Sequence, residues 1–195
     1  MLEKLNFRIV GASPLMCHNG ELADPGNKWS LAIREISGKR KKVQADYEEM
    51  ARLEFLGGLY LLNKEPCIPG RVFEGALVGK GGAARKERAG KIAQIGVYVL
   101  GNFPLEYDGP KDPFKMWEMH VNGDSTFVDQ SLVIIGQARI VRCRPIFQKW
   151  AAVITVEVDT EFVDLETAKR WVEVAGQQVG LMDWRPKYGR FSVEW

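Results

Sequence analysis

Alternating apolar and polar residues predict β-strands at several places along the chain. The clearest is 151–159, in which one face carries only apolar side chains, including Ile154, Val156 and Val158. The segment 132–147 is expected to form one long strand with a bulge near Gly136 and Gln137. Shorter strands are expected in the segment from Leu5, in 58–62, in the segment from Lys91 and in 190–195.

Apolar residues at helical spacing predict three helices. The first covers 44–56 and is followed by two glycines, which commonly end a helix. The second covers 71–78, begins after an Ile-Pro-Gly turn and ends in a glycine-rich stretch. The third begins after Asp164, a side chain suited to capping a helix N-terminus, and is expected to end at Gly176 or Gly180.

The order of these elements is strand, two helices with a short strand between them, several strands, helix, strand. Its second half fits a ferredoxin-like plan, so the fold class predicted is α+β, with an antiparallel sheet and helices on one face. We expect residues 1–195 to form a single ferredoxin-like domain with an irregular, Pro- and Gly-rich excursion near 101–130. One sheet face then stays uncovered, and RNA-recognition sheets bind RNA on that face.

The composition is that of an ordinary folded protein, with 46% hydrophobic and 27% charged residues. No apolar run approaches the roughly 20 residues needed to cross a bilayer, and no signal-peptide pattern follows Met1, so a cytoplasmic protein without membrane contact is expected. Cys17, Cys67 and Cys143 lack metal-ligand spacing and are expected to be buried in a reducing compartment. No metal and no cofactor are expected.

The net charge is only +2, but cations and carboxylates are segregated along the sequence. Basic residues gather in four segments, each beside glycine or an aromatic residue: 38–42, 79–91, 139–149 and 184–190. Segregation of this kind favours a basic face that binds nucleic acid, although charge runs also occur on faces that contact only water. The cations expected to neutralise phosphates in the second and third segments are Lys80, Arg85, Lys86, Arg88, Arg142 and Arg144.

The segment 184–190 interleaves two aromatic residues with three cations. Trp184 and Tyr188 offer flat surfaces for stacking unpaired bases, and three cations can reach phosphates: Arg185, Lys187 and Arg190. A structural role uses the same residues, with both rings covering the edge of the core and Asp183 pairing with Arg185. Both interpretations remain open at this stage.

Two further aromatic residues lie in the connection between the two long strands. Phe147 and Trp150 would indicate a partner if they were exposed at a hairpin tip. Burial of at least one of them in the core is the favoured interpretation.

Two segments carry a resemblance to a known family. IPGRVFEGALVGKGGAARK (68–86) combines an Ile-Pro-Gly turn with a helix of small residues, and in GLMDWRPKYGRFSV (180–193) glycines bracket basic and aromatic residues before the last strand. Both resemble segments of the RAMP superfamily, the backbone and processing subunits of CRISPR effectors. The resemblance covers about a sixth of the chain. The resemblance implies a ferredoxin-like core that binds RNA. For a subunit of the backbone type, it also implies assembly along a guide RNA. A phage-encoded relative of the family is also consistent with a chain of this size.

Catalytic signals are weak. The two histidines, His18 and His120, lie about a hundred residues apart in sequence, and serines do not occur in a GxSxG pattern. The resemblance implies His18 as a general base of processing nucleases and Asp24 as the loop aspartate of target-cleaving subunits. These two residues are the only catalytic candidates.

Three hypotheses follow. The first is a non-catalytic protein that binds single-stranded nucleic acid, RNA before DNA, and assembles along it as a homo-oligomer or in a multi-subunit complex. The second is a structural or interaction component of a virion or other assembly, with exposed aromatic residues as protein contacts. The third is a metal-independent endoribonuclease that uses His18.

Overall fold

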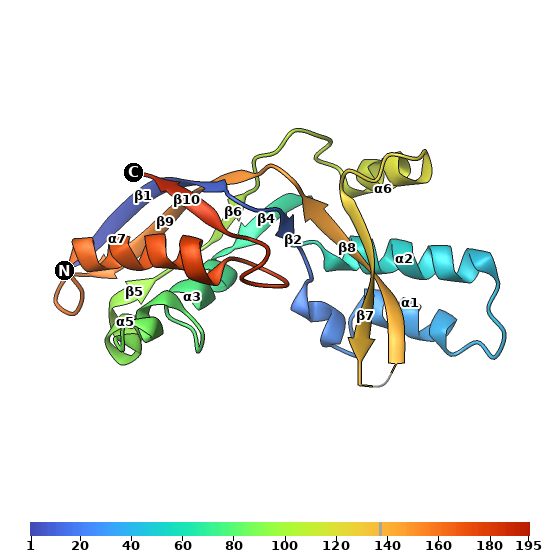
Figure 1. Cartoon of the computed structure of the whole chain (residues 1–195), viewed down its shortest axis with the longest axis horizontal. Helices are drawn as coiled ribbons and strands as arrows, with labels where there is room; N and C mark the ends of the chain where they lie inside the picture. Colours follow the sequence, from blue (N-terminus) through green and yellow to red (C-terminus); the bar gives the residue numbers. More distant parts are fainter. Residues whose placement is uncertain (137) are drawn as a thin grey trace. The chain divides into compact units, whose positions relative to one another are not determined.

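The computed structural model describes residues 1–136 and 138–195, and the chain forms two compact units built from separate stretches of sequence. Unit 1 contains Met1–Leu15, Leu61–Asp108 and Gln148–Trp195. Unit 2 contains Met16–Tyr60 and Gly109–Phe147. Unit 2 therefore consists of two insertions into the sequence of unit 1 (Figure 1).

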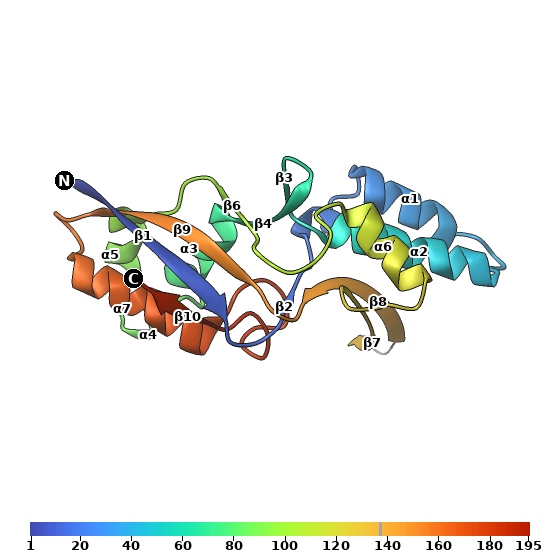
Figure 2. The same ribbon diagram turned by 90° about the horizontal axis from the view of Figure 1, so that it is seen from above.

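Unit 1 contains a four-stranded antiparallel sheet in the order β10-β1-β9-β5. Its strands are β1 (Leu2–Gly11), β5 (Val97–Tyr98), β9 (Ala151–Asp159) and β10 (Phe191–Glu194). Helices lie on one face of this sheet (Figures 1 and 2), namely α3 (Gly70–Leu77), α4 (Ala83–Lys86), α5 (Gly90–Gly96) and α7 (Leu165–Val174). If the four strands are numbered in chain order, their order across the sheet is 4-1-3-2. Helices lie in the connections from β1 to β5 and from β9 to β10, as in a ferredoxin-like fold. The predicted α+β class is confirmed.

The core of unit 1 lies between this sheet and its helices. Alternation along β1 and β9 turns one set of side chains inward, and Phe7, Ile9 and Ile154 are at most 3% exposed. The Phe7 ring lies 6.0 Å from that of Phe73 on α3, measured between centroids. Burial of each such side chain contributes about 1.5–3 kcal/mol. A smaller sheet in the same unit has the order β3-β4-β6, with β3 (Leu61–Leu62), β4 (Glu65–Pro69) and β6 (Asn102–Pro104).

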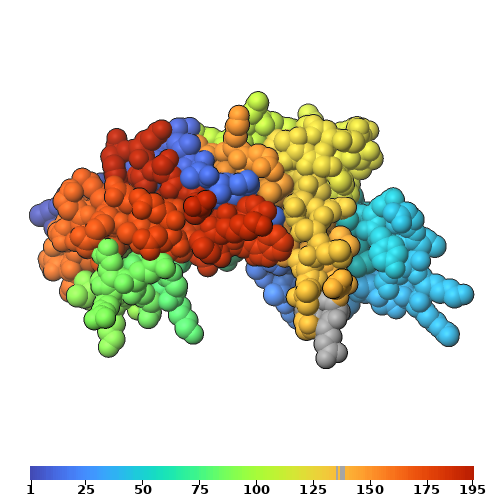
Figure 3. Space-filling view, in the orientation of Figure 1, coloured from blue at the N-terminus to red at the C-terminus, as the bar shows by residue number. Residues whose placement is uncertain are grey.

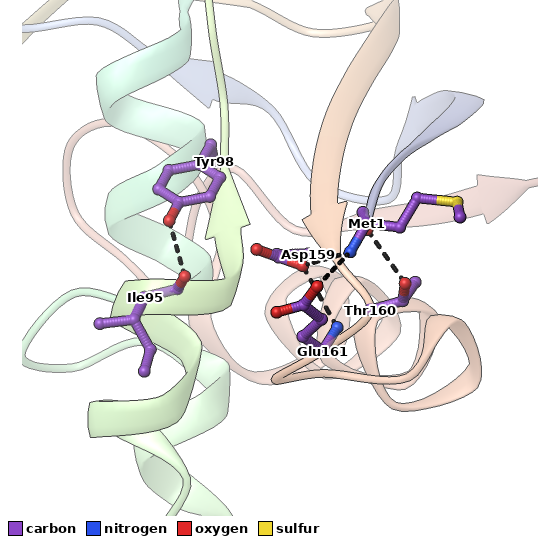
Figure 4. A network of polar contacts seen from close by, with 6 residues as sticks. All are labelled: Met1, Ile95, Tyr98, Asp159, Thr160 and Glu161. Carbon is purple, nitrogen blue, oxygen red and sulfur yellow. Dashed lines mark hydrogen bonds and ion pairs between the residues drawn. The ribbon is translucent and has the colours of Figure 1, made fainter.

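Polar contacts join the start of β1 to the end of β9 (Figure 4). The amino group of Met1 lies 2.9 Å from the Asp159 carboxylate, and Thr160 donates its amide N–H and its hydroxyl to the Met1 carbonyl. The hydrogen bond from this amino group lowers the pKa of the Asp159 carboxyl below its ordinary value. Nearby, the Tyr98 hydroxyl donates to the Ile95 carbonyl at 2.6 Å, linking β5 to the end of α5.

Unit 2 contains helices and a β-hairpin. The helices are the 3₁₀ turn η1 (Gly20–Ala23), α1 (Lys28–Ser37), α2 (Gln44–Gly58) and α6 (Pro113–Val121). The hairpin pairs β7 (Val128–Ile135) with β8 (Ala138–Phe147) in antiparallel register, and β2 (Leu15–Met16) lies on the other side of β8. Helix α2 packs on β8, and the Phe55 and Trp117 rings join α2 to α6 with centroids 5.5 Å apart.

The single strand predicted over 132–147 is wrong. The chain reverses at Gly136, whose φ of +61° suits glycine, and Leu132 pairs with Val141 across the resulting hairpin. A glycine flanked by two apolar runs has the pattern of a hairpin as well as that of a bulge. Gln137, the second residue of the predicted bulge, lies outside the described residues.

Three helices differ from the sequence-based expectation. The strand predicted from Lys91 begins as helix α5 and becomes strand β5 only at Val97, because Ala93 and Gly96 form a small-residue face that packs inward. Helix α1 was expected to be loop up to Ser30, and α6 falls within the predicted excursion near 101–130. Both helices have a side-chain cap at the N-terminus, Asn27 for α1 and Asp112 for α6.

The predicted burial of the cysteines is confirmed, and so is the prediction that at least one of the two connecting aromatic residues is buried, since both are. Cys17, Cys67 and Cys143 are buried thiols. Phe147 is buried in unit 2, and in unit 1 Trp150 is 3% exposed and donates its indole N–H to the Ser13 carbonyl at 2.8 Å. In the part of the chain that the structure describes, no helix is long and apolar enough to span a membrane.

Candidate nucleic-acid interface

The segment 180–190, which we call the terminal loop, connects the end of α7 to β10. It begins where the π-helical turn η2 (Ala175–Val179) ends. Gly180 and Gly189 have φ values of +74° and +73°, a backbone conformation that favours glycine. Leu181 N–H donates to the Gly189 carbonyl at 2.9 Å and closes the loop on itself. A Cβ atom on Gly189 would overlap the Leu181 carbonyl, so the closed loop requires glycine at this position.

Further hydrogen bonds anchor the terminal loop to the segment that follows β1. Gly189 N–H donates to the Pro14 carbonyl at 2.8 Å, and Arg190 N–H donates to the Ser13 hydroxyl at 3.0 Å. Ala12 N–H donates to the Arg190 carbonyl at 2.7 Å. The loop is therefore held at its base by the sheet of unit 1, and its side chains have a fixed support.

The two aromatic residues of the terminal loop form one cluster with a lysine. The Trp184 and Tyr188 rings are stacked, with centroids 5.9 Å apart and planes inclined by 21°. The Lys187 ammonium lies 5.3 Å from the Tyr188 ring centroid and 5.9 Å from that of Trp184. Trp184 remains 39% exposed, whereas Tyr188 is half-buried beneath it. The indole is thus the accessible ring and Tyr188 supports it.

Exposed cations lie on the terminal loop and on the glycine-rich segment 79–91. Arg185 and Arg190 are exposed on the terminal loop itself. In the glycine-rich segment 79–91 the structure exposes all four predicted cations, Lys80, Arg85, Lys86 and Arg88. Helix α4 of this segment packs against α7 and η2, which lead directly into the terminal loop. Figure 3 shows α7 and the loop in red, with the green segment emerging beneath α7.

A carboxylate within the glycine-rich segment fixes it to α7. Glu87 accepts two-pronged hydrogen bonds from Arg170, at 2.8–3.1 Å, and one from the buried indole of Trp171 at 3.0 Å. Hydrogen bonding to Arg170 lowers the pKa of Glu87. The glycine-rich segment is therefore tied to the helix that ends at the terminal loop.

The uncovered face of the unit 1 sheet has a different character. Its Arg8 guanidinium lies 2.8 Å from Glu106 and 3.1 Å from Glu194, and Lys4 lies 3.3 Å from Glu157. These cations are neutralised by carboxylates on the same face. The terminal loop is therefore a better candidate for binding phosphates than the sheet face used by RNA-recognition sheets.

Two of the cations predicted to contact phosphates belong to unit 2. Arg142 on β8 forms an ion pair with Glu54 of α2, whose other carboxylate oxygen accepts the Cys143 N–H at 2.9 Å. Arg144 is only 8% exposed. Burial raises the pKa of Cys143 to about 12. The other predicted phosphate-binding cations belong to unit 1, and contact of Arg142 and Arg144 with phosphates stays a prediction.

Arg142 and Arg144 line a cavity of ≈ 340 Å³ together with His18 and Arg34. Arg34 was not among the predicted site residues, because helix α1 was not predicted from the sequence. Asn27 gave a usable signal, since its side chain accepts the Trp29 N–H at 2.9 Å and caps that helix.

The catalytic candidates do not form a recognisable catalytic group. His18 is exposed at this cavity, whereas Asp24 accepts the Gly26 N–H at 2.8 Å in a local turn. Among residues 1–136 and 138–195, no group of three His, Cys, Asp or Glu side chains could hold a metal ion.

Comparison with known proteins gives one structural likeness to report. No family model and no curated protein matches the chain. The chain is similar to the crystal structure of Cmr6 from Pyrococcus furiosus, with 12% sequence identity and a TM-score of 0.44, over 100% of this chain and 99% of the other.

Proposed function

We propose that this chain is a non-catalytic protein that binds single-stranded nucleic acid on the terminal loop of unit 1. The observation that carries the proposal is the exposed Trp184 ring, stacked on Tyr188, flanked by Lys187 and held on a loop that its own hydrogen bonds close. A base can stack on the indole while the neighbouring cations contact its phosphates. Stacking requires an unpaired base, so single strands are the expected ligand.

RNA is proposed before DNA because segments 68–86 and 180–193 resemble the RAMP superfamily. The resemblance also favours a place in a larger complex along the bound strand. The ferredoxin-like sheet of unit 1 is compatible with this placement.

Fluorescence anisotropy with labelled oligonucleotides of mixed sequence tests the proposal, using single-stranded RNA, single-stranded DNA and an RNA duplex. We expect the single strands to bind more tightly than the duplex. Replacing Trp184 by Ala should weaken binding by about 1–3 kcal/mol, or roughly fivefold to 150-fold, because one stacking surface is lost. The matched control is Tyr47→Ala, which removes an aromatic side chain that is 57% exposed in unit 2. Absence of binding at about 50 mM salt, where phosphate contacts are strong, would contradict the proposal.

A second candidate, an assembly component whose main partner is protein, is favoured by the β7–β8 hairpin. Leu132, Ile134 and Val141 are 66%, 71% and 59% exposed, and the pairing register places all three on one face. Contiguous exposed apolar residues commonly mark protein contacts. Light scattering after size exclusion, with and without oligonucleotide, separates the two candidates. This second function would be favoured by an oligomer whose mass is the same with and without oligonucleotide and which does not form in the Ile134→Lys variant.

A further inference from the structure

A cavity of ≈ 410 Å³ lies between the C-terminal end of α7, with the turn η2 that follows it, and strand β10. All of its described lining residues belong to unit 1. One of them is Arg190, the last residue of the terminal loop. The volume falls within the roughly 300–1,000 Å³ that is common for small-molecule sites. A ligand in this cavity therefore contacts unit 1 and is continuous with the terminal loop through Arg190.

The wall and the bottom of the cavity consist of closely packed elements. Gly176 of η2 approaches β10 so closely that a Cβ atom on it would overlap the carbonyl and the ring of Phe191. Both residues are buried, so they form the bottom of the cavity. The turn η2 is π-helical, and π-helical turns are rare and often occur at functional sites. The shape of the cavity is therefore set by the packing of a helix end on a strand.

The charged side chains of the cavity lie towards opposite ends. Arg190 precedes the contact between Gly176 and β10. Glu173, about one turn earlier on α7, accepts the indole N–H of Trp195 at 3.2 Å, and Trp195 directly follows β10. A phosphate is attracted to the arginine and repelled by the glutamate. A nucleotide is therefore expected to enter with its phosphate at Arg190 and its base towards Glu173.

Two exposed side chains of the cavity, Glu173 and Gln177, can contact that base. They are four positions apart, so they are neighbours on one side of the helix end. An ionised carboxylate only accepts hydrogen bonds, whereas an amide both donates and accepts. One oxygen of Glu173 accepts the Trp195 indole, and the carboxylate has further acceptor capacity for a ligand. The base end of the cavity is thus richer in acceptors than in donors.

We propose that this cavity binds a nucleobase that carries an exocyclic amino group, with the phosphate of the same nucleotide at Arg190. The proposal deepens the proposed function and rests on it. The amino group of cytosine or adenine can donate to the Glu173 carboxylate and leave a neighbouring contact for Gln177. Uracil has a carbonyl oxygen where cytosine has its amino group, and two acceptors do not form a hydrogen bond. The cavity therefore discriminates against uracil.

The first measurement compares single-stranded RNA oligonucleotides of equal length by fluorescence anisotropy. One pair is oligo(C) and oligo(U), and the other is oligo(A) and an oligomer of purine riboside, which lacks only the amino group of adenosine. We expect the amino-bearing member of each pair to bind at least about fivefold more tightly. Trp184→Ala should weaken both members of a pair alike and preserve their ratio.

The discriminating variant is Glu173→Gln. Its amide oxygen can still accept the Trp195 indole, but its amide N–H groups can donate to the uracil carbonyl. The ratio of oligo(C) to oligo(U) affinity should therefore fall to about one. Glu166→Gln is the matched control, because it makes the same change of charge on α7 at an exposed residue outside the described lining. It should change both affinities alike and keep the ratio.

The outcomes separate the cavity from the proposed function. Binding of single strands with equal affinity within both pairs would overturn the cavity proposal and leave the proposed function standing. If no oligonucleotide binds, the proposed function fails, and NMR titration with cytidine 5′-monophosphate and uridine 5′-monophosphate then tests the cavity by itself. Larger shifts of the Gln177 side-chain amide signals with the cytidine nucleotide would support the cavity. The same response to both nucleotides, or no response, would overturn it.

Discussion

At the residue scale, the aromatic and basic residues of the terminal loop could be identified from the sequence, but their division of roles could not. The interleaving of Trp184, Lys187 and Tyr188 is visible in seven consecutive residues. Which ring is exposed depends on the loop closure between Leu181 and Gly189, a contact that no local pattern reveals. The pairing of Arg142 with Glu54 could not be predicted either, because 88 positions separate the two residues in sequence.

Replacing Gly189 by Ala should both destabilise the protein and weaken nucleic-acid binding. The residue has φ +73°, and its Cβ would overlap the Leu181 carbonyl, so the loop must open to accept it. We expect the free energy of unfolding to fall by roughly 2 kcal/mol or more. Gly123→Ala is the control, because Gly123 also has positive φ but its Cβ would meet nothing within 4 Å. If urea denaturation shows the same loss of unfolding free energy for Gly189→Ala and Gly123→Ala, the overlap with Leu181 makes no contribution and the positive φ alone accounts for the loss.

The cysteine thiols should react slowly in the folded protein. Burial raises the pKa of Cys67 to about 11 and that of Cys143 to about 12. At pH 8 little thiolate is then present, and the thiolate is the reactive form. A colorimetric disulfide reagent should modify all three cysteines within minutes in denaturant and only slowly without it. Rapid modification of the native protein at one site, mapped by mass spectrometry, would contradict the burial.

At the element scale, the elements with a sustained apolar period were predictable, whereas α5 was not. Helices α2 and α7 and strands β1 and β9 carry periodic apolar residues over nine or more positions. Helix α5 has seven residues, and its apolar side chains Ile92 and Ile95 are exposed, so it was mistaken for a strand. Small residues, Ala93 and Gly96, make its contacts instead, and their packing depends on tertiary neighbours.

The link between the glycine-rich segment and α7 should contribute measurably to stability. Glu87→Ala removes the acceptor of the buried Trp171 indole N–H, which should cost about 1–3 kcal/mol of the free energy of unfolding. Glu166→Ala, which breaks the exposed pair with Lys169 on the same helix, should cost at most about 1 kcal/mol. Urea denaturation of the three proteins checks both values, and similar losses for both variants would contradict the role of the indole.

The Glu87 contribution also has a defined pH dependence. Arg170 lowers the pKa of the folded carboxyl below its ordinary value of 4.5. Its stabilising effect is therefore complete above that pH and is lost as the pH falls through the lower folded pKa. The difference in unfolding free energy between the parent and Glu87→Gln should shrink as the pH is lowered from about 6 to about 3. A difference that stays constant over this interval would show that the charge of Glu87 is not involved.

At the scale of the whole molecule, the ferredoxin-like order of unit 1 followed from the sequence, whereas unit 2 did not. The elements of unit 1 appear in the expected order: strand β1, then the helices and strands that begin at Leu61, and finally β9, α7 and β10. Unit 2 depends on the association of two insertions, 16–60 and 109–147, and single-sequence periodicity does not report contacts between such distant segments. The cavity that contains Arg34, Arg142 and Arg144 exists only through that association.

The salt dependence of nucleic-acid binding measures how much of the basic surface of unit 1 is used. Each phosphate neutralised on a single strand contributes about −0.7 to the slope of log affinity against log salt. The three cations of the terminal loop alone predict a slope of about −2, whereas the loop together with the four cations of the glycine-rich segment predicts about −5. We expect the steeper value, because α4 packs against the helix that leads into the loop. The double variant Lys86→Ala/Arg88→Ala should then reduce the slope by about 1.4, while Lys115→Ala, exposed in unit 2, should not change it. A slope near −2 that the double variant leaves unaltered would restrict the interface to the terminal loop.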